Sequence, residues 1–169
     1  HDLWRAKPYS LATASECLAL AATYGLGLAL ALGPLSRLLG GMRGALRLRR
    51  PLGVVSAMCG LAHAALALGP LRAELGEIPT DLGATANVAL GVISGLLFIL
   101  LAGISWQPAL TRLGARAWKR VQALGWPLLA IILTHFMVLG KIQGWQQWFA
   151  THDKPAPQGT LWMFIFGVL

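Results

Sequence analysis

Charged side chains are scarce in this chain of 169 residues: they make up 12% of it, and only six residues are acidic. A soluble domain usually carries about 25% charged residues, so the composition argues against an ordinary soluble domain. The two cysteines, Cys17 and Cys59, form no CxxC or CxxCH pattern, which excludes covalent c-type haem attachment through such a motif. There is no phosphate-binding glycine loop and no nucleophile elbow, so the sequence gives no support to those enzyme classes.

Long apolar runs dominate instead: 56% of the residues are hydrophobic, and the mean hydropathy is +0.64. Runs of roughly 18–22 apolar residues are long enough to cross about 30 Å of hydrocarbon as helices. We therefore predict an all-α, polytopic transmembrane helical bundle in a single domain, 1–169. The four full spans are expected at 12–32, 52–69, 84–106 and 122–140, and a truncated fifth begins near Thr160. No internal repeat is visible in the sequence.

The basic residues are concentrated in alternate connecting segments. Segments 34–51 and 107–120 hold nine of the fourteen lysines and arginines and no acid, whereas segment 70–83 holds one arginine and three acids. The positive-inside rule then places the basic loops 34–51 and 107–120 in the cytoplasm of a multi-pass membrane protein. Because the positive charge follows this topology, we do not attribute the net charge of +8 to nucleic-acid binding.

Two histidines lie inside predicted spans. His63 follows Arg50 by thirteen residues and His135 follows Arg120 by fifteen, which gives depths of roughly 20 and 22 Å at about 1.5 Å per residue. The second and fourth spans run in the same direction, so we expect the two imidazoles to face each other from neighbouring helices. Two histidines are too few for a structural zinc site but sufficient as axial ligands of a haem iron. Thr134 and Ser56 are candidate hydrogen-bond partners for the two rings.

Three segments resemble the ferric reductase-like transmembrane domain family, in order, spacing and loop charge. They are LRLRRPLGVVSAMCGLAHAAL (46–66), VALGVISGLLFILLAGISW (88–106) and LTRLGARAWKRVQALGWPLLAIILTHF (110–136). The resemblance covers roughly residues 10–140 and is greatest to the haem-binding membrane subunits of bacterial methionine-sulfoxide reductase systems, the MsrQ or YedZ type. Six helices are usual in that family. The resemblance therefore implies a further helix before His1 and a last helix that is cut short.

The resemblance also implies a site and a role. His63 and His135 match haem ligands of the family, but Gln122 stands where the family has another histidine, and Arg49 stands where an inner ligand is expected. We therefore expect one haem b, in the outer half of the membrane. The family relationship implies a cytoplasmic flavin reductase or quinol as electron donor, with flavin or quinone as a possible second cofactor. The implied acceptor is a periplasmic methionine-sulfoxide reductase, and the implied location is the bacterial inner membrane.

Two function classes remain open from the sequence. In the first, the chain is an electron-transfer subunit of an oxidoreductase, whose partner performs the substrate chemistry. In the second, the chain is a haem-free or haem-poor structural subunit of a larger membrane complex, and Gln122 marks a lost ligand. Both readings have the lipid bilayer and other protein subunits as partners. The presence or absence of bound haem in the purified protein distinguishes the two function classes.

Overall fold

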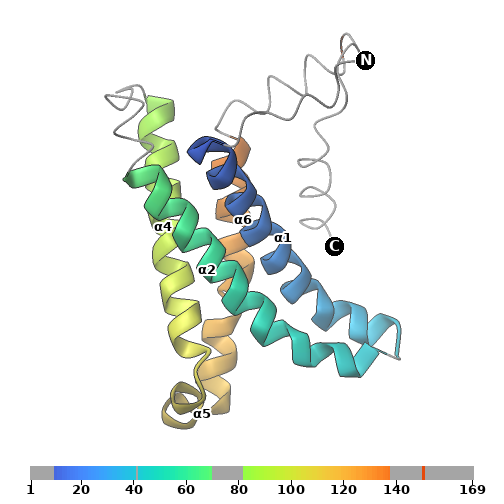
Figure 1. The fold of residues 1–169 in the computed structure, drawn as a ribbon. Coiled ribbons are helices and arrows are strands. Elements are labelled where there is room, and N and C mark those ends of the chain that lie inside the picture. The colour runs from blue at the N-terminus through green and yellow to red at the C-terminus, as the bar shows by residue number, and fades with distance from the viewer. Residues whose placement is uncertain (1–9, 41, 70–81, 138–149, 151–169) are drawn as a thin grey trace.

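The computed structural model of the chain describes residues 10–40, 42–69, 82–137 and 150. Their secondary structure is helical throughout, with no strand in these ranges, which confirms the predicted all-α class (Figure 1). The elements are α1 (Leu11–Leu38), the 3-10 helix η1 (Met42–Leu48), α2 (Arg49–Leu68), α4 (Leu82–Ile104), α5 (Gln107–Gln122) and α6 (Gly125–Phe136).

Three stretches are long and apolar enough to cross a membrane: α1, 44–68 and 85–104. They confirm the first three predicted spans and make this a multi-pass membrane protein. The fourth predicted span, 122–140, is helical from Gly125 to Phe136. Its last residues, and the whole of the fifth span expected near Thr160, lie outside the described residues.

The two basic segments are helical rather than loops, and this corrects the sequence-based expectation. Helix α1 continues past Pro34 to Leu38, and Gly40, with φ of 60°, turns the chain into η1. Segment 107–120 lies within α5 (Gln107–Gln122), in which two helical stretches meet at a kink at Gly114, with φ of 74°. In the second stretch, Arg116, Lys119 and Arg120 are spaced to share one helix face. The indole N–H of Trp118 donates to the carbonyl of Ile104 at 2.9 Å, which ties α5 to the end of α4.

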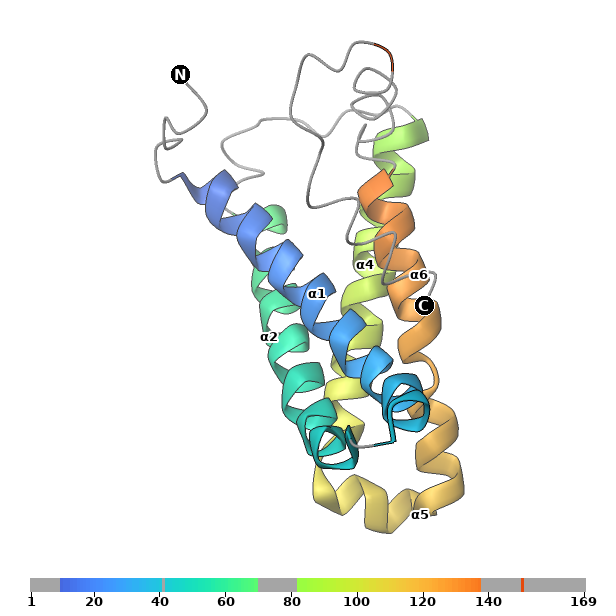
Figure 2. The ribbon, with the colours of Figure 1, turned by 90° about the vertical axis from the view of Figure 1, so that its right-hand side faces the viewer.

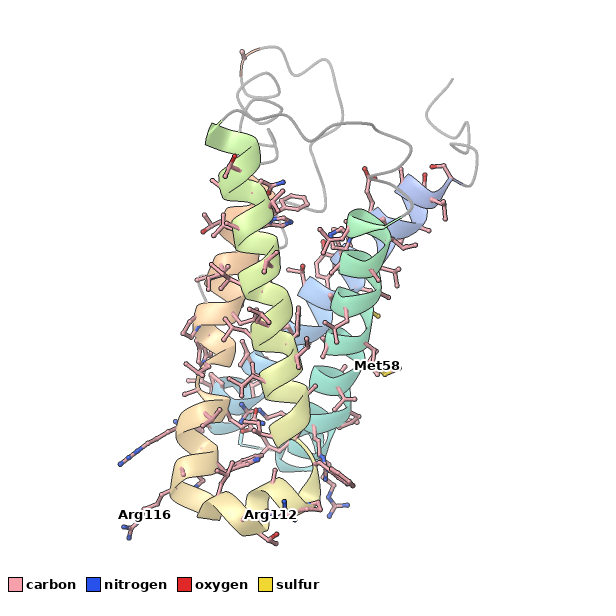
Figure 3. All side chains as sticks on the ribbon, turned by 90° about the vertical axis from the view of Figure 1, so that its left-hand side faces the viewer. Met58, Arg112 and Arg116 are labelled. Atoms are coloured by element: carbon pink, nitrogen blue, oxygen red, sulfur yellow. The ribbon has the colours of Figure 1, made fainter. Side chains whose placement is uncertain are left out.

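All of these basic segments gather at one end of the bundle, which we call the basic end (Figure 2). Arg112 and Arg116 point away from the helices there (Figure 3). Helices α2 and α6 both run from the basic end towards the opposite end, as predicted from the charge pattern (Figure 2).

Four helices form a closed ring. Helix α2 packs against α1 and α4, and α6 packs against α4 and α1, so α2 and α6 stand at opposite corners. The expectation that these two helices are neighbours is therefore wrong. The hairpins α1–α2 and α4–α6 lie close together at the basic end and diverge towards the opposite end (Figures 2 and 3).

The apolar core fills the half of the ring nearer the basic end. It consists of small residues of α1 and α2 and larger side chains of α1, α4 and α6: Ala22, Leu26, Leu30, Ala57, Phe98, Leu101, Leu128 and Leu129. The ring of Phe98 lies directly on Gly60, where an added Cβ would be 2.6 Å from it, so α2 and α4 approach closely at that level. Large apolar residues such as Met58 face outward instead, as expected of lipid-facing positions (Figure 3).

Replacement of Leu128 by alanine is expected to lower the free energy of unfolding by about 2 kcal/mol or more, because its side chain is fully buried and the cavity left behind loses packing contacts on all sides. Thermal or SDS-induced unfolding of the purified protein in detergent measures this change. Leu96→Ala is the matched control, since Leu96 is 62% exposed and loses few protein contacts. Equal losses in the two variants would contradict this location of the core.

Candidate functional site

His63 is held by a residue of the preceding transmembrane helix. Its Nδ1 lies 2.8 Å from Oγ of Ser15 and 3.0 Å from the carbonyl oxygen of Ser15, on α1. A carbonyl oxygen can only accept a hydrogen bond, so Nδ1 carries the proton and donates. Nε2 then keeps its lone pair, and within the described residues it has no hydrogen-bond partner. This is the tautomer that a metal-ligating imidazole needs.

His135, on α6, is held in the same way by α4. Its Nδ1 donates to the carbonyl oxygen of Asn87 at 2.9 Å, which leaves the lone pair on Nε2. The ring also lies against Gly91, where an added Cβ would be 3.2 Å from Cε1. The absent side chain at Gly91 therefore makes room for this imidazole.

The two histidine sites repeat each other in the fold. Each histidine donates to the carbonyl of the residue 48 positions earlier, so His63 and His135 are 72 positions apart, as are Ser15 and Asn87. The hairpins α1–α2 and α4–α6 are thus equivalent at this level, although no repeat is visible in the sequence. Membrane helices need only apolar side chains to form the same hairpin, so the geometry can be shared without sequence similarity.

We call the end of the ring that carries His63 and His135 the histidine end. In the described parts of the helices there, 11–21, 61–68, 85–95 and 131–137, the two buried side chains are both small and polar, Ser15 and Ser94. No apolar side chain in those ranges is buried, in contrast to the filled core at the basic end. The histidine end therefore lacks a fully buried apolar core of its own, although Leu61, Ile132 and Leu133 pack against the edge of the core nearer the basic end.

Helix α4 turns a narrow polar face towards this region. Asn87, Gly91 and Ser94 follow one another at helical spacing, and His135 contacts the first two. Oδ1 of Asn87 and Oγ of Ser94 are buried without a hydrogen-bond partner among the described residues. Such atoms are costly to bury alone, so they are suited to contact with a bound molecule. This face was not predicted from the sequence. The helical spacing of the small and polar residues Asn87, Gly91 and Ser94 could have indicated it.

The hydroxyls of Thr134 and Ser56, which were predicted to bond to the two histidines, have other hydrogen-bond partners. Oγ1 of Thr134 donates to the carbonyl of Ala130 at 2.9 Å, and Oγ of Ser56 donates to the carbonyl of Leu52 at 2.7 Å. Both hydroxyls therefore bond to their own helix, and their assignment to the imidazoles is wrong. The actual partners, Ser15 and Asn87, are on other helices.

Gln122 and Arg49 are at the basic end, separated from the histidines by the apolar core. The side-chain amide of Gln122 donates to Oγ of Ser105 at 3.3 Å, and Nε of Arg49 donates to the carbonyl of Ala29 at 3.0 Å. No group of three or more His, Cys, Asp or Glu side chains suited to a metal ion occurs among the described residues. The two histidines can therefore serve a metal that brings most of its own ligands, and a porphyrin iron is such a metal.

One family model matches the chain, and its description is a ferric reductase-like transmembrane component. The match covers residues 18–134, which includes His63 and ends one residue before His135. No curated protein and no solved structure gives a significant match. Because the matched segment is more than half of the 169 residues, the chain belongs to the family of ferric reductase-like transmembrane components.

Proposed function

We propose that the chain is an electron-transfer subunit that holds one haem b at the histidine end, with His63 and His135 as the axial ligands. The observation that carries this proposal is the shared state of the two rings. Each donates its Nδ1 proton to a backbone carbonyl of another helix and so keeps its lone pair on Nε2, which has no hydrogen-bond partner among the described residues. A carbonyl on Nδ1 is the usual companion of an imidazole that binds a metal through Nε2.

The surroundings of the two rings suit a porphyrin. The histidines come from opposite corners of the helix ring, so two imidazoles can approach one iron from its two faces. Gly91 makes room for the His135 ring itself, and the histidine end has no buried apolar side chain in its described residues. When bound, haem b supplies a one-electron couple between ferric and ferrous iron. The protein holds and orients the two imidazoles and surrounds them with apolar helices.

Two observations support a single haem rather than two. Leu128, Phe98 and their neighbours fill the ring towards the basic end, and Leu128 has no exposed surface. Gln122 and Arg49, which occupy the positions of possible inner ligands, are each bonded to protein oxygens. Neither side chain is a usual haem ligand.

The direction of electron flow follows from the charge pattern. With the basic end in the cytoplasm of a bacterium, the histidine end lies in the outer half of the inner membrane. We propose that electrons come from a cytoplasmic flavin reductase or a quinol. They pass to a periplasmic acceptor such as a methionine-sulfoxide reductase, as in the MsrQ-type subunits that the sequence resembles. Substrate chemistry belongs to the partner, because this chain supplies only the relay.

The test is the absorption spectrum and haem content of the protein purified from cells supplied with haem precursor. We expect one haem per chain and a Soret band that shifts on reduction, with the sharp α band of six-coordinate low-spin iron. Circular dichroism of the same sample reports whether the helices are formed. A fully helical protein that takes up no haem would overturn the proposal and favour a structural subunit.

A further inference from the structure

We infer that Ser15 is a positioning residue. Its hydroxyl oxygen holds the His63 ring at Nδ1 and makes His63 the more electron-donating of the two axial ligands. This inference rests on the proposed function. It concerns a side chain that lies one helix away from the ligand and that no sequence motif marks. Its consequence is that the two imidazoles, although equivalent in the fold, are unequal in chemistry.

The orientation of the Ser15 hydroxyl is unusual for this protein. Five other helical hydroxyls donate to a carbonyl three or four residues earlier in their own helix: Thr23, Ser36, Ser56, Thr111 and Thr134. That bond is the common choice for serine and threonine in apolar helices. Ser15 Oγ instead lies 2.8 Å from Nδ1 of His63 on α2, and the residue is only 3% exposed. Its hydroxyl is thus committed to a contact between helices.

Two oxygens of one residue share the Nδ1 proton of His63. Since the Ser15 carbonyl at 3.0 Å requires Nδ1 to donate, the hydroxyl oxygen at 2.8 Å acts as a second acceptor for the same proton. Acceptors on Nδ1 increase the basicity of Nε2. A more basic axial ligand stabilises ferric iron relative to ferrous iron and so lowers the midpoint potential.

The equivalent site at His135 has one acceptor. Nδ1 of His135 donates to the Asn87 carbonyl at 2.9 Å, and no side-chain oxygen joins this bond in the described residues. Asn87 stands at the position equivalent to Ser15, but its Oδ1 has no hydrogen-bond partner. The difference between the two ligands therefore lies in one hydroxyl group.

Substitution of Ser15 isolates that hydroxyl, because the backbone carbonyl stays. In Ser15→Ala, we expect haem to bind still, with about tenfold lower affinity, the lower end of the range for loss of such an outer partner. We also expect a higher midpoint potential. A tenfold change in the preference for ferric over ferrous iron corresponds to about 59 mV for one electron. Ser15→Thr restores the oxygen and should return both values towards wild type.

The measurements are a redox titration followed at the α band and a haem-transfer assay. The matched control is Ser56→Ala, which removes a buried serine hydroxyl that bonds only to Leu52 within α2, and its potential should equal that of wild type. A wild-type potential in haem-loaded Ser15→Ala would overturn the inference, as would a change that Ser15→Thr does not reverse. Absence of haem from the wild-type protein would instead count against the proposed function, so the two failures are distinguishable.

Discussion

Purified His63→Ala and His135→Ala proteins are each expected to be colourless, with haem affinity reduced more than about 100-fold, beyond the effect of losing an outer partner. Each change removes one of the two protein ligands proposed for the iron, and the described residues contain no group of three or more His, Cys, Asp or Glu side chains that could form another metal site. The measurement is a haem titration followed at the Soret band. Added imidazole should restore part of the six-coordinate spectrum, since a small ligand can occupy the space of the lost ring.

Two variants control for general damage to the membrane protein. Gln122→Ala removes an amide that bonds to Ser105 at the basic end, and His152→Ala removes a histidine outside the predicted spans. Both should bind haem as the wild type does. Retention of the six-coordinate spectrum in either ligand variant would show that the iron is bound elsewhere. Loss of haem in Gln122→Ala would point to a ligand at the basic end.

The spans and their directions could be predicted because the bilayer imposes them. A chain in hydrocarbon must pair its backbone groups internally, so an apolar run of the right length becomes a helix. The positions of His63 and His135 on helices that start from the same end follow from the charged segments that flank them. The basic segments themselves were expected to be loops because they are rich in charge. They form short helices because basic residues can share one helix face, as Arg116, Lys119 and Arg120 do in the part of α5 that follows the kink at Gly114.

The contacts of the histidines could not be predicted from the sequence. Ser15 and Asn87 are 48 residues from their histidines, and each uses its backbone carbonyl, which every residue type has. Ser56 and Thr134 were the nearer candidates, but a hydroxyl on an apolar helix is satisfied by its own backbone at little cost. The opposite-corner arrangement of α2 and α6 likewise depends on how the hairpins pack, and helix order alone leaves that open.

Gly91→Leu is expected to abolish haem binding while the helices remain formed. The Cβ alone would stand 3.2 Å from Cε1 and 3.7 Å from Nδ1 of His135, and the further carbons of leucine would overlap the ring. The imidazole must then swing away and give up its 2.9 Å bond to the Asn87 carbonyl. Gly91→Ala should be milder, because a shift of a few tenths of an ångström accommodates one methyl group. Haem titration and circular dichroism measure the two effects separately.

The control is Gly95→Leu, on the same helix one turn further on. An added Cβ at Gly95 meets nothing within 4 Å, so the larger side chain extends into open space and leaves His135 undisturbed. Both substitutions replace glycine by a strong helix former, so their effects on α4 itself should be alike. A haem affinity lost equally in the two variants would mean that α4 responds to bulk anywhere along it. Wild-type affinity in Gly91→Leu would mean that the His135 ring does not hold the iron from this position.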